Sequence, residues 1–194
     1  AQVDIVAITN HNIFDLKQFN RFCEELGETE RLWPGVELDV CSSREKSHWH
    51  MLVITSPSKK EQFNSALKQL LGDTSPDEVL VNVKDVFNCF RDIGAIFISH
   101  AHDKSPYISQ DDMSEMEALV GEDEKWRLFY EPRSLVTVGI WSNHGFNMML
   151  GSDVQDWGNY PNCELPDLRL PVSTFEQFCL LAKRDGKTIE TLLG

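Results

Sequence analysis

The sequence predicts an α/β fold built on a largely parallel β-sheet. Short apolar runs, rich in branched residues, alternate along the chain with segments whose apolar residues recur at helical spacing. The apolar runs are almost continuous, which is typical of strands buried on both faces. The 194 residues suffice for one domain with a substantial core, and no internal repeat divides them.

The first half of the chain contains most of the predicted elements. Strands are expected at four apolar runs, at residues 3–9, 32–40, 50–54 and 95–99. Helices are expected where apolar residues recur at helical spacing, at residues 16–26, 58–71 and 83–93, each followed by a glycine. Ser58 and Glu61 form a capping-box pattern at the second helix, and Asn82 is the expected cap of the third.

The second half is less regular. Residues 103–125 are acidic and weakly patterned, which indicates either a long functional loop or an insertion with a short helix. The remaining predictions are a strand at 127–131, a helix at 133–145, a strand running into a turn at 147–153, and a proline-rich surface crossing at 157–171. A last helix follows, with Ser173 and Glu176 as its capping box.

Composition excludes some classes of function. The net charge of −13 argues against a broad electropositive surface for nucleic acid, although bound cations could supply positive charge locally. No apolar run approaches the roughly 20 residues that span a bilayer, so no membrane partner is expected. The cysteines form no CxxC pair, and Cys23, Cys89 and Cys179 lie on apolar faces of predicted helices. This pattern predicts buried reduced thiols and a cytoplasmic protein.

Residues of metal-binding type stand at the ends of the predicted strands. They are His11, Glu37, His48, His50, His100, His102 and Asp153. In barrel-like α/β folds the C-terminal strand ends meet at one mouth, and imidazole with carboxylate is a ligand set for Zn, Mn or Fe. His50 precedes its apolar run, so it reaches that mouth only if its strand is reversed or the chain enters obliquely. Each residue alone also fits a structural role, but the conjunction favours a metal site.

Five motifs carry a family resemblance. In chain order they are Thr9-Asn10-His11, Gly35-Val36-Glu37, His50, Ser99-His100 and Gly151-Ser152-Asp153-Val154-Gln155. Their order and approximate spacing resemble those of the PHP (polymerase and histidinol phosphatase) domain across residues 1 to about 156. The resemblance implies a distorted (β/α)7 TIM-like barrel of the PHP type over residues 1–170.

The resemblance also implies a chemistry. PHP domains hold two or three divalent metal ions (Zn, Mn or Fe) and hydrolyse phosphate esters through a metal-bound hydroxide. The implied metal ligands are His11, Glu37, His50, His100 and Asp153. Of these, His11, Glu37, His100 and Asp153 would be catalytic, with Glu37 as the bridging carboxylate. The substrate would be a nucleotide, a nucleic-acid end or a small phosphoester.

Three departures separate the sequence from this pattern. The family's first strand, with its H-x-H motif, lies before the point where residue 1 begins, so the barrel is expected to be incomplete at the N-terminus. Gln155 replaces the last histidine, and Asn10 replaces an aspartate. An amide is a poor ligand for Zn or Mn, so His48 or His102 would have to compensate.

The tail carries a narrower resemblance. Residues 173–190 look like the stretch that joins such a domain to an ATPase in larger bacterial proteins, so 171–194 is expected to be a helix and tail leading out of the domain. A covalently linked or associated ATPase domain is the implied partner. Whether the chain is an enzyme stays open, the alternatives being a degenerate PHP-like domain with a structural or regulatory role beside an ATPase, and another metal hydrolase such as an amidohydrolase.

Overall fold

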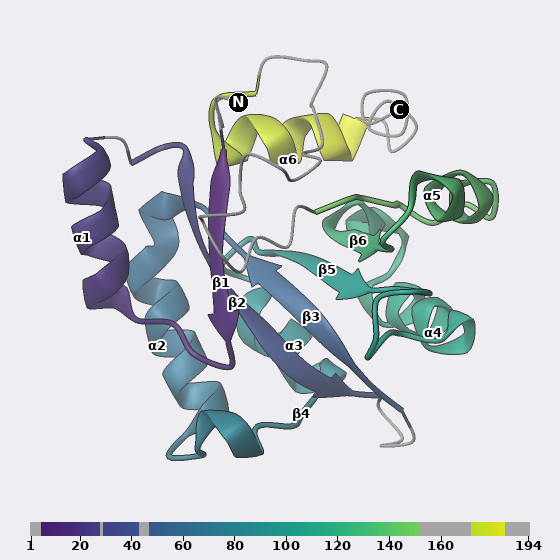
Figure 1. Cartoon of the computed structure of the whole chain (residues 1–194), viewed down its shortest axis with the longest axis horizontal. Coiled ribbons are helices and arrows are strands. Elements are labelled where there is room, and N and C mark those ends of the chain that lie inside the picture. The colour runs from purple at the N-terminus through teal and green to yellow at the C-terminus, as the bar shows by residue number, and fades with distance from the viewer. Residues whose placement is uncertain (1–4, 28, 43–46, 152–171, 185–194) are drawn as a thin grey trace.

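The predicted α/β class is confirmed. The structure, a computed structural model, describes residues 5–27, 29–42, 47–151 and 172–184 (Figure 1). Its sheet has six strands in the order β1-β2-β3-β5-β6, with β4 paired to β2. The strands are β1 Val6–His11, β2 Leu32–Cys41, β3 His48–Ile54, β4 Val81–Asn82, β5 Ile96–His100 and β6 Leu128–Glu131.

One strand of the sheet is reversed. β1 is parallel to β2, and β5 is parallel to β6, whereas β3 is antiparallel to both of its neighbours, β2 and β5. The sheet is also open, because β1 and β6 stand at opposite ends of the strand order among the described residues. The distorted (β/α)7 barrel, expected to be incomplete at its N-terminus, is therefore not confirmed, because the described residues form an open six-stranded sheet. The strand expected at 147–153 is only a single parallel bridge between Tyr130 and Met148 within the described chain.

Six helices surround the sheet in the described residues. They are α1 Leu16–Leu26, α2 Lys60–Leu71, α3 Val83–Phe90, α4 Gln110–Val120, α5 Leu135–Ser142 and α6 Phe175–Arg184. Three 3-10 helices lie at Pro57–Lys59, Pro76–Glu78 and Glu122–Arg127. Of the two alternatives for residues 103–125, the insertion with a helix is the correct one, because α4 buries Met113 and Met116 in the core. No helix in these ranges has both the length and the apolar character needed to cross a bilayer.

The helix ends agree with the sequence in part. Asn82 accepts a hydrogen bond from the backbone N–H of Lys84, as expected of a cap. The capping box at Ser58 is wrong, because Ser56 caps a preceding 3-10 helix and α2 begins only at Lys60. Ser58 therefore lies inside the 3-10 helix Pro57–Lys59 and not at the N-terminus of α2.

The capping box predicted for the last helix is also wrong, by one residue. The Thr174 hydroxyl accepts from the Gln177 backbone N–H, and the Gln177 side chain accepts from the Ser173 backbone N–H. Glu176 instead accepts a hydrogen bond of 2.5 Å from the Ser56 hydroxyl. That bond ties α6 to the loop that follows β3.

The two faces of the sheet carry separate apolar clusters. One face packs against α1 to α4, and its cluster contains Val36 and Leu38 of β2 together with aromatic side chains such as Phe63 and Phe90. The opposite face packs against α6. Its cluster consists of Trp33, Ile54, Ile96, Ile98, Phe129, Phe175, Phe178 and Ala182. The predicted boundary at residue 170 lies outside the described residues, and the described part of 171–194 is this helix packed on the sheet.

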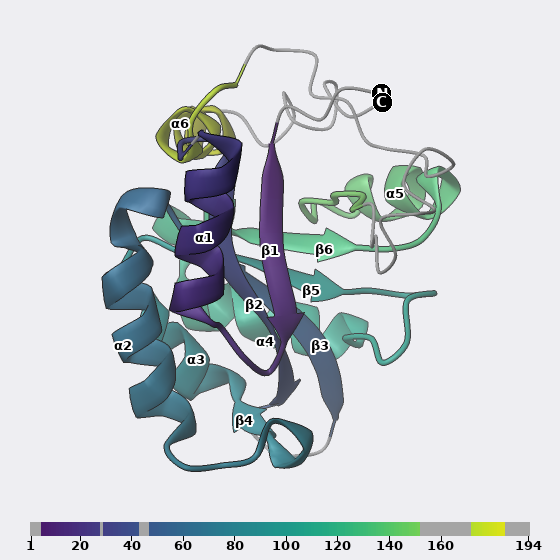
Figure 2. The same ribbon diagram turned by 60° about the vertical axis from the view of Figure 1, so that its left-hand side comes forward.

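α6 covers only one end of its face of the sheet. In both views it lies where β1 begins (Figures 1 and 2). Side chains alternate along a strand, so Glu37 shares the face of Trp33, His100 that of Ile98, and Glu131 that of Phe129. The face is therefore apolar under α6 and polar at the C-terminal ends of the parallel strands.

Phe178 offers a test of this packing. Its ring is 3% exposed and lies 5.6 Å from Trp33 and 5.8 Å from Phe129 between centroids. Phe178→Ala is expected to lower the free energy of unfolding by about 3–5 kcal/mol in urea denaturation. Leu180→Ala, on the exposed side of the same helix, should change it by less than about 0.5 kcal/mol. Equal effects of the two changes would mean that α6 does not pack on the sheet.

Candidate metal centre

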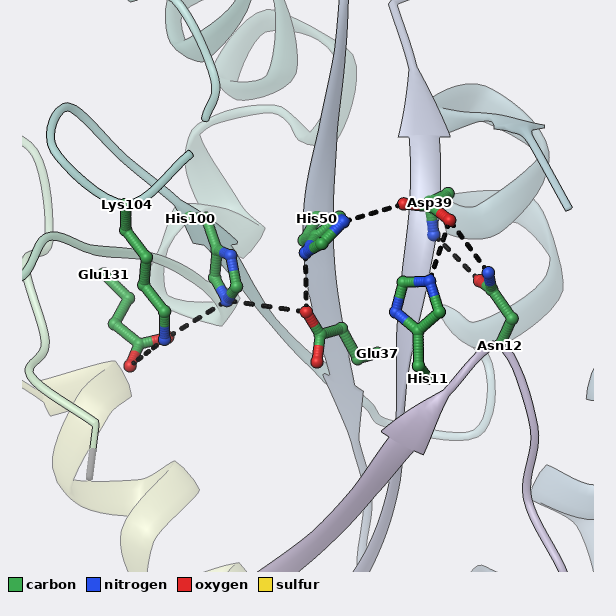
Figure 3. Close-up of polar contacts among 8 residues, drawn as sticks. All are labelled: His11, Asn12, Glu37, Asp39, His50, His100, Lys104 and Glu131. Carbon is green, nitrogen blue, oxygen red and sulfur yellow. Dashed lines mark hydrogen bonds and ion pairs between the residues drawn. The ribbon is translucent and has the colours of Figure 1, made fainter. Parts of the chain in front are cut away.

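A row of acidic and imidazole side chains crosses the C-terminal edge of the parallel strands (Figure 3). The strand register pairs His11 with Glu37, Asp39 with His50, and His100 with Glu131. Opposite residues on neighbouring strands lie close together on one face of a sheet. The register alone therefore brings residues separated by up to 120 positions of sequence into one polar row, from His11 of β1 to Glu131 of β6.

His50 occupies the middle of this row. Its Nδ1 lies 2.7 Å from Oε1 of Glu37, and its Nε2 lies 2.9 Å from Oδ1 of Asp39. His50 is near the start of β3, and β3 runs antiparallel to its neighbours. Of the two alternatives expected for His50, the reversed strand is the one present, and it carries His50 to the edge where the parallel strands end.

The β1 side of the row is held by Asp39. Its Oδ2 lies 3.0 Å from Nε2 of His11 and accepts a hydrogen bond of 2.9 Å from the Asn12 amide. The Asn12 side-chain oxygen in turn accepts from the Asp39 backbone N–H at 2.9 Å. Asn12 is buried with a φ of 54°, a left-handed conformation that asparagine tolerates better than most residues. Asn12 therefore fixes the orientation of the Asp39 carboxylate.

The β5 side of the row centres on His100. Its Nε2 lies 3.9 Å from Oε1 of Glu37 and 3.6 Å from Oε2 of Glu131, and its buried Nδ1 has no hydrogen-bond partner among the described residues. Burial lowers the pKa of His100 to about 3, with further lowering by the charges of Lys104, His50 and Arg133. His100 is therefore neutral at physiological pH, which is the form of imidazole that binds a metal.

A buried ion pair ends the row. Nζ of Lys104 lies 2.8 Å from Oε1 of Glu131, and both side chains are almost fully buried. Lys104 follows β5 in a turn closed by a hydrogen bond from its backbone N–H to the Ala101 carbonyl. This turn directs the lysine side chain back to the sheet edge.

The side chains fit a divalent metal ion. Two groups of three offer ligand atoms that all lie within 4.8 Å of one another, namely His11, Asp39 and His50, and Glu37, His50 and His100. Four ligands at about 2.1 Å from a tetrahedral ion are about 3.4 Å apart, so small side-chain movements would suffice. The mixture of imidazole and carboxylate suits Zn, Mn or Fe. His50 belongs to both groups, with Nδ1 facing Glu37 and Nε2 facing Asp39, and as a neutral ring it would offer the lone pair of one of these nitrogens to an ion.

The structure brings together four of the five expected ligands, which are His11, Glu37, His50 and His100. Asp153 and Gln155 lie outside the described residues. His48 and His102, suggested as substitutes, are both exposed and belong to neither ligand group, and the His102 ring lies edge-on to Trp141 at 6.0 Å.

Sequence reasoning missed three residues of the row. Asp39 lies two positions after Glu37, a spacing that puts both on one face of a strand. Glu131 ends the strand predicted at 127–131, where the strand-end rule applied equally well. No pattern in the sequence marked Lys104 as a residue of the row, because its position depends on the turn after β5.

Gly151, the first residue of the last motif, packs directly on Glu131. A Cβ at this position would overlap Oε1 of Glu131. Gly151→Ala is therefore expected to displace that carboxylate and lower the free energy of unfolding by about 1–3 kcal/mol in urea denaturation. Gly139→Ala is the matched control, since a Cβ there meets open space in α5 and should be neutral or stabilising by up to about 1 kcal/mol. A neutral Gly151→Ala would contradict the contact.

Comparisons with known proteins find similarity of structure but no match to a sequence family. No protein-family model matches the sequence, and no curated protein matches it. The fold is similar to a crystal structure from Bifidobacterium adolescentis, of a protein provisionally described as a metal-dependent phosphoesterase. The similarity has a TM-score of 0.53 at 14% identity and covers 98% of this chain and 85% of that one. At this identity the likeness concerns the fold.

Proposed function

We propose that this chain is a metal-dependent phosphoesterase-like domain that hydrolyses a phosphate ester. The observation that carries the proposal is the position of His50 between two acidic and imidazole ligand groups at the C-terminal edge of the strands. Active sites of barrel-like α/β enzymes lie at this edge. The fold shared with a protein described as a phosphoesterase supports the reaction class.

The residues of the row have separable roles in this proposal. A bound divalent ion would supply a Lewis acid and lower the pKa of water, as in other metal-dependent hydrolases. Glu37 lies between His50 and His100, so its carboxylate would be a ligand of an ion held by these two imidazoles. Asn12 holds Asp39 in place, and neutral His100 offers a nitrogen lone pair.

Substrate attraction needs local positive charge, because the chain as a whole carries −13. Arg133 is exposed, yet its charge is close enough to His100 to lower the pKa of that imidazole. We propose its guanidinium as the group that meets the substrate phosphate. A nucleotide, a nucleic-acid end or a small phosphoester would satisfy this chemistry, with His11, Glu37, His100 and Asp153 as the residues proposed to take part in catalysis.

The test is a paired measurement of metal content and hydrolysis. Purified protein would be analysed for metal, then assayed on p-nitrophenyl phosphate and bis(p-nitrophenyl) phosphate with and without Mn²⁺. Glu37→Gln is expected to lower activity by about 100-fold or more, because a proposed metal-ligating carboxylate is lost. Glu25→Gln, on the exposed side of α1, should leave it unchanged. Hydrolysis that persists in Glu37→Gln would exclude this site.

A second function is favoured by one observation. Glu131 occupies the ligand edge of β6, but its carboxylate is paired with the ammonium of Lys104. This arrangement, with Gln155 in the last motif, supports a degenerate PHP-like domain with a structural or regulatory role beside an ATPase. Absence of both bound metal and hydrolysis in the paired measurement would favour this alternative.

A further inference from the structure

We propose that Lys104 is a built-in cation of the site, whose ammonium occupies the place of one metal ion at the Glu131 end of the row. The inference rests on the proposed metal site and concerns how many ions that site accepts. Under this proposal the described row takes up ions only around His50, and its β5–β6 end is neutralised by the protein itself.

The spacing of the side chains supports a closed ion position. Nε2 of His100 lies 3.6 Å from Oε2 of Glu131 and 3.9 Å from Oε1 of Glu37. These distances are near the roughly 3.4 Å that separates two ligands of one tetrahedral ion. Without Lys104, the His100 imidazole and the Glu131 carboxylate would therefore face a common point, while Glu37 belongs to the ligand group of His50.

Lys104 supplies the charge at that point. Its Nζ is 2.8 Å from Oε1 of Glu131, and its side chain is 6% exposed. Figure 3 shows the lysine extending alongside His100 to reach Glu131. The same ammonium is one of the charges that lower the pKa of His100, after burial itself. A divalent ion placed here would meet a fixed positive charge within a few ångströms, which opposes its binding.

The geometry around the pair makes the lysine hard to displace. The turn at Ala101 fixes the Lys104 backbone, and Gly151 packs against the Glu131 carboxylate from another segment. Burial also makes each partner costly to leave without the other. A metal ion would have to expel the ammonium into water while Glu131 stays in place.

The test is metal stoichiometry by equilibrium dialysis against Mn²⁺ and Zn²⁺ followed by elemental analysis. Lys104→Met removes the charge and keeps the side-chain volume, so it should bind one more equivalent of metal than the wild type. Lys104→Met with Glu131→Gln should lose that extra equivalent, because the freed carboxylate is gone. Lys125→Met, which removes a lysine from an ion-pair cluster with Glu117 and Glu122, should bind as the wild type does.

Thermal unfolding provides a second readout if Lys104→Met is unstable. Removing the ammonium takes away a cation that lies 2.8 Å from a buried carboxylate, so the melting temperature should fall in chelator and recover when Mn²⁺ or Zn²⁺ is added. If Lys104 had a purely structural role, added metal would not reverse the fall in melting temperature of Lys104→Met. The proposal is overturned if metal raises the melting temperature of Lys104→Met no more than that of the double variant with Glu131→Gln.

The outcomes separate this inference from the proposed function. Equal stoichiometry in the wild type and in Lys104→Met overturns the role of Lys104, whether or not the protein hydrolyses phosphate esters. A wild type without metal and a Lys104→Met variant with one equivalent would support the role of Lys104 and overturn the phosphoesterase proposal. An extra equivalent that survives Glu131→Gln would also overturn the inference, since the ion would then bind elsewhere.

Discussion

His50→Ala is expected to abolish tight binding of a divalent metal ion and, with it, any hydrolysis of phosphate esters. His50 is the one residue common to both ligand groups in the described part of the chain. Its loss leaves two ligands in each group and removes the nitrogen contacts of Glu37 and Asp39 at once. Changes beyond the direct ligands already cost about 10–100-fold in metal affinity, so we expect a loss of at least about 100-fold in titration calorimetry with Zn²⁺.

His48→Ala is the matched control for this prediction. His48 lies on the same strand, has the same side chain and is exposed outside both ligand groups. It should leave metal affinity within about twofold of the wild type, and both variants should keep the same circular dichroism spectrum. If the two histidines contribute equally to affinity, the metal lies at neither of the two groups described.

The strand-end residues could be predicted because two local rules determine them. Continuous apolar runs indicated the strands ending near His11 and His100, and the C-terminal edge rule placed their ends together. The position of Glu37 within β2 follows from side-chain alternation, which sets it on the face of Trp33. These inferences need only the sequence near each residue.

The remaining features depend on contacts between distant segments. The antiparallel direction of β3 is set by its pairing with β2 and β5. No single residue within β3 determines that direction. Lys104 reaches Glu131 because a turn after β5 and the register of β6 bring the two together. Neither is a property of one stretch of sequence, so the row was predicted without its buried cation.

The burial of the cysteine thiols could also be predicted only in part. Cys23, Cys89 and Cys179 were expected on buried helix faces, and burial raises the pKa of each, that of Cys179 to about 12. Cys23 is fully buried, whereas Cys89 and Cys179 are half-buried. Periodicity gives the face of a helix, but the depth of burial depends on which neighbour covers it. The cytoplasmic location stays a prediction.

Acid is expected to destabilise the metal-free protein through His100. The pKa of an ordinary histidine is 6.5, and that of folded His100 is lowered to about 3. Between these values the unfolded chain binds a proton that the folded protein does not, so the free energy of unfolding falls as the pH falls. The contribution approaches about 1.4 kcal/mol per pH unit within that window, and it is absent above the window because both states are then neutral.

Urea denaturation in chelator at a series of pH values between 6.5 and about 3 measures this slope. His100→Gln should give a shallower slope than the wild type, whatever its absolute stability, because the titrating ring is gone. His144→Gln, at an exposed ring beside Trp141, should keep the wild-type slope. Carboxylates away from His100 titrate alike in all three proteins and cancel in the comparison. Parallel slopes for the wild type and His100→Gln would mean that His100 binds its proton equally in the folded and unfolded chain, and that the β5 side of the row is open to water.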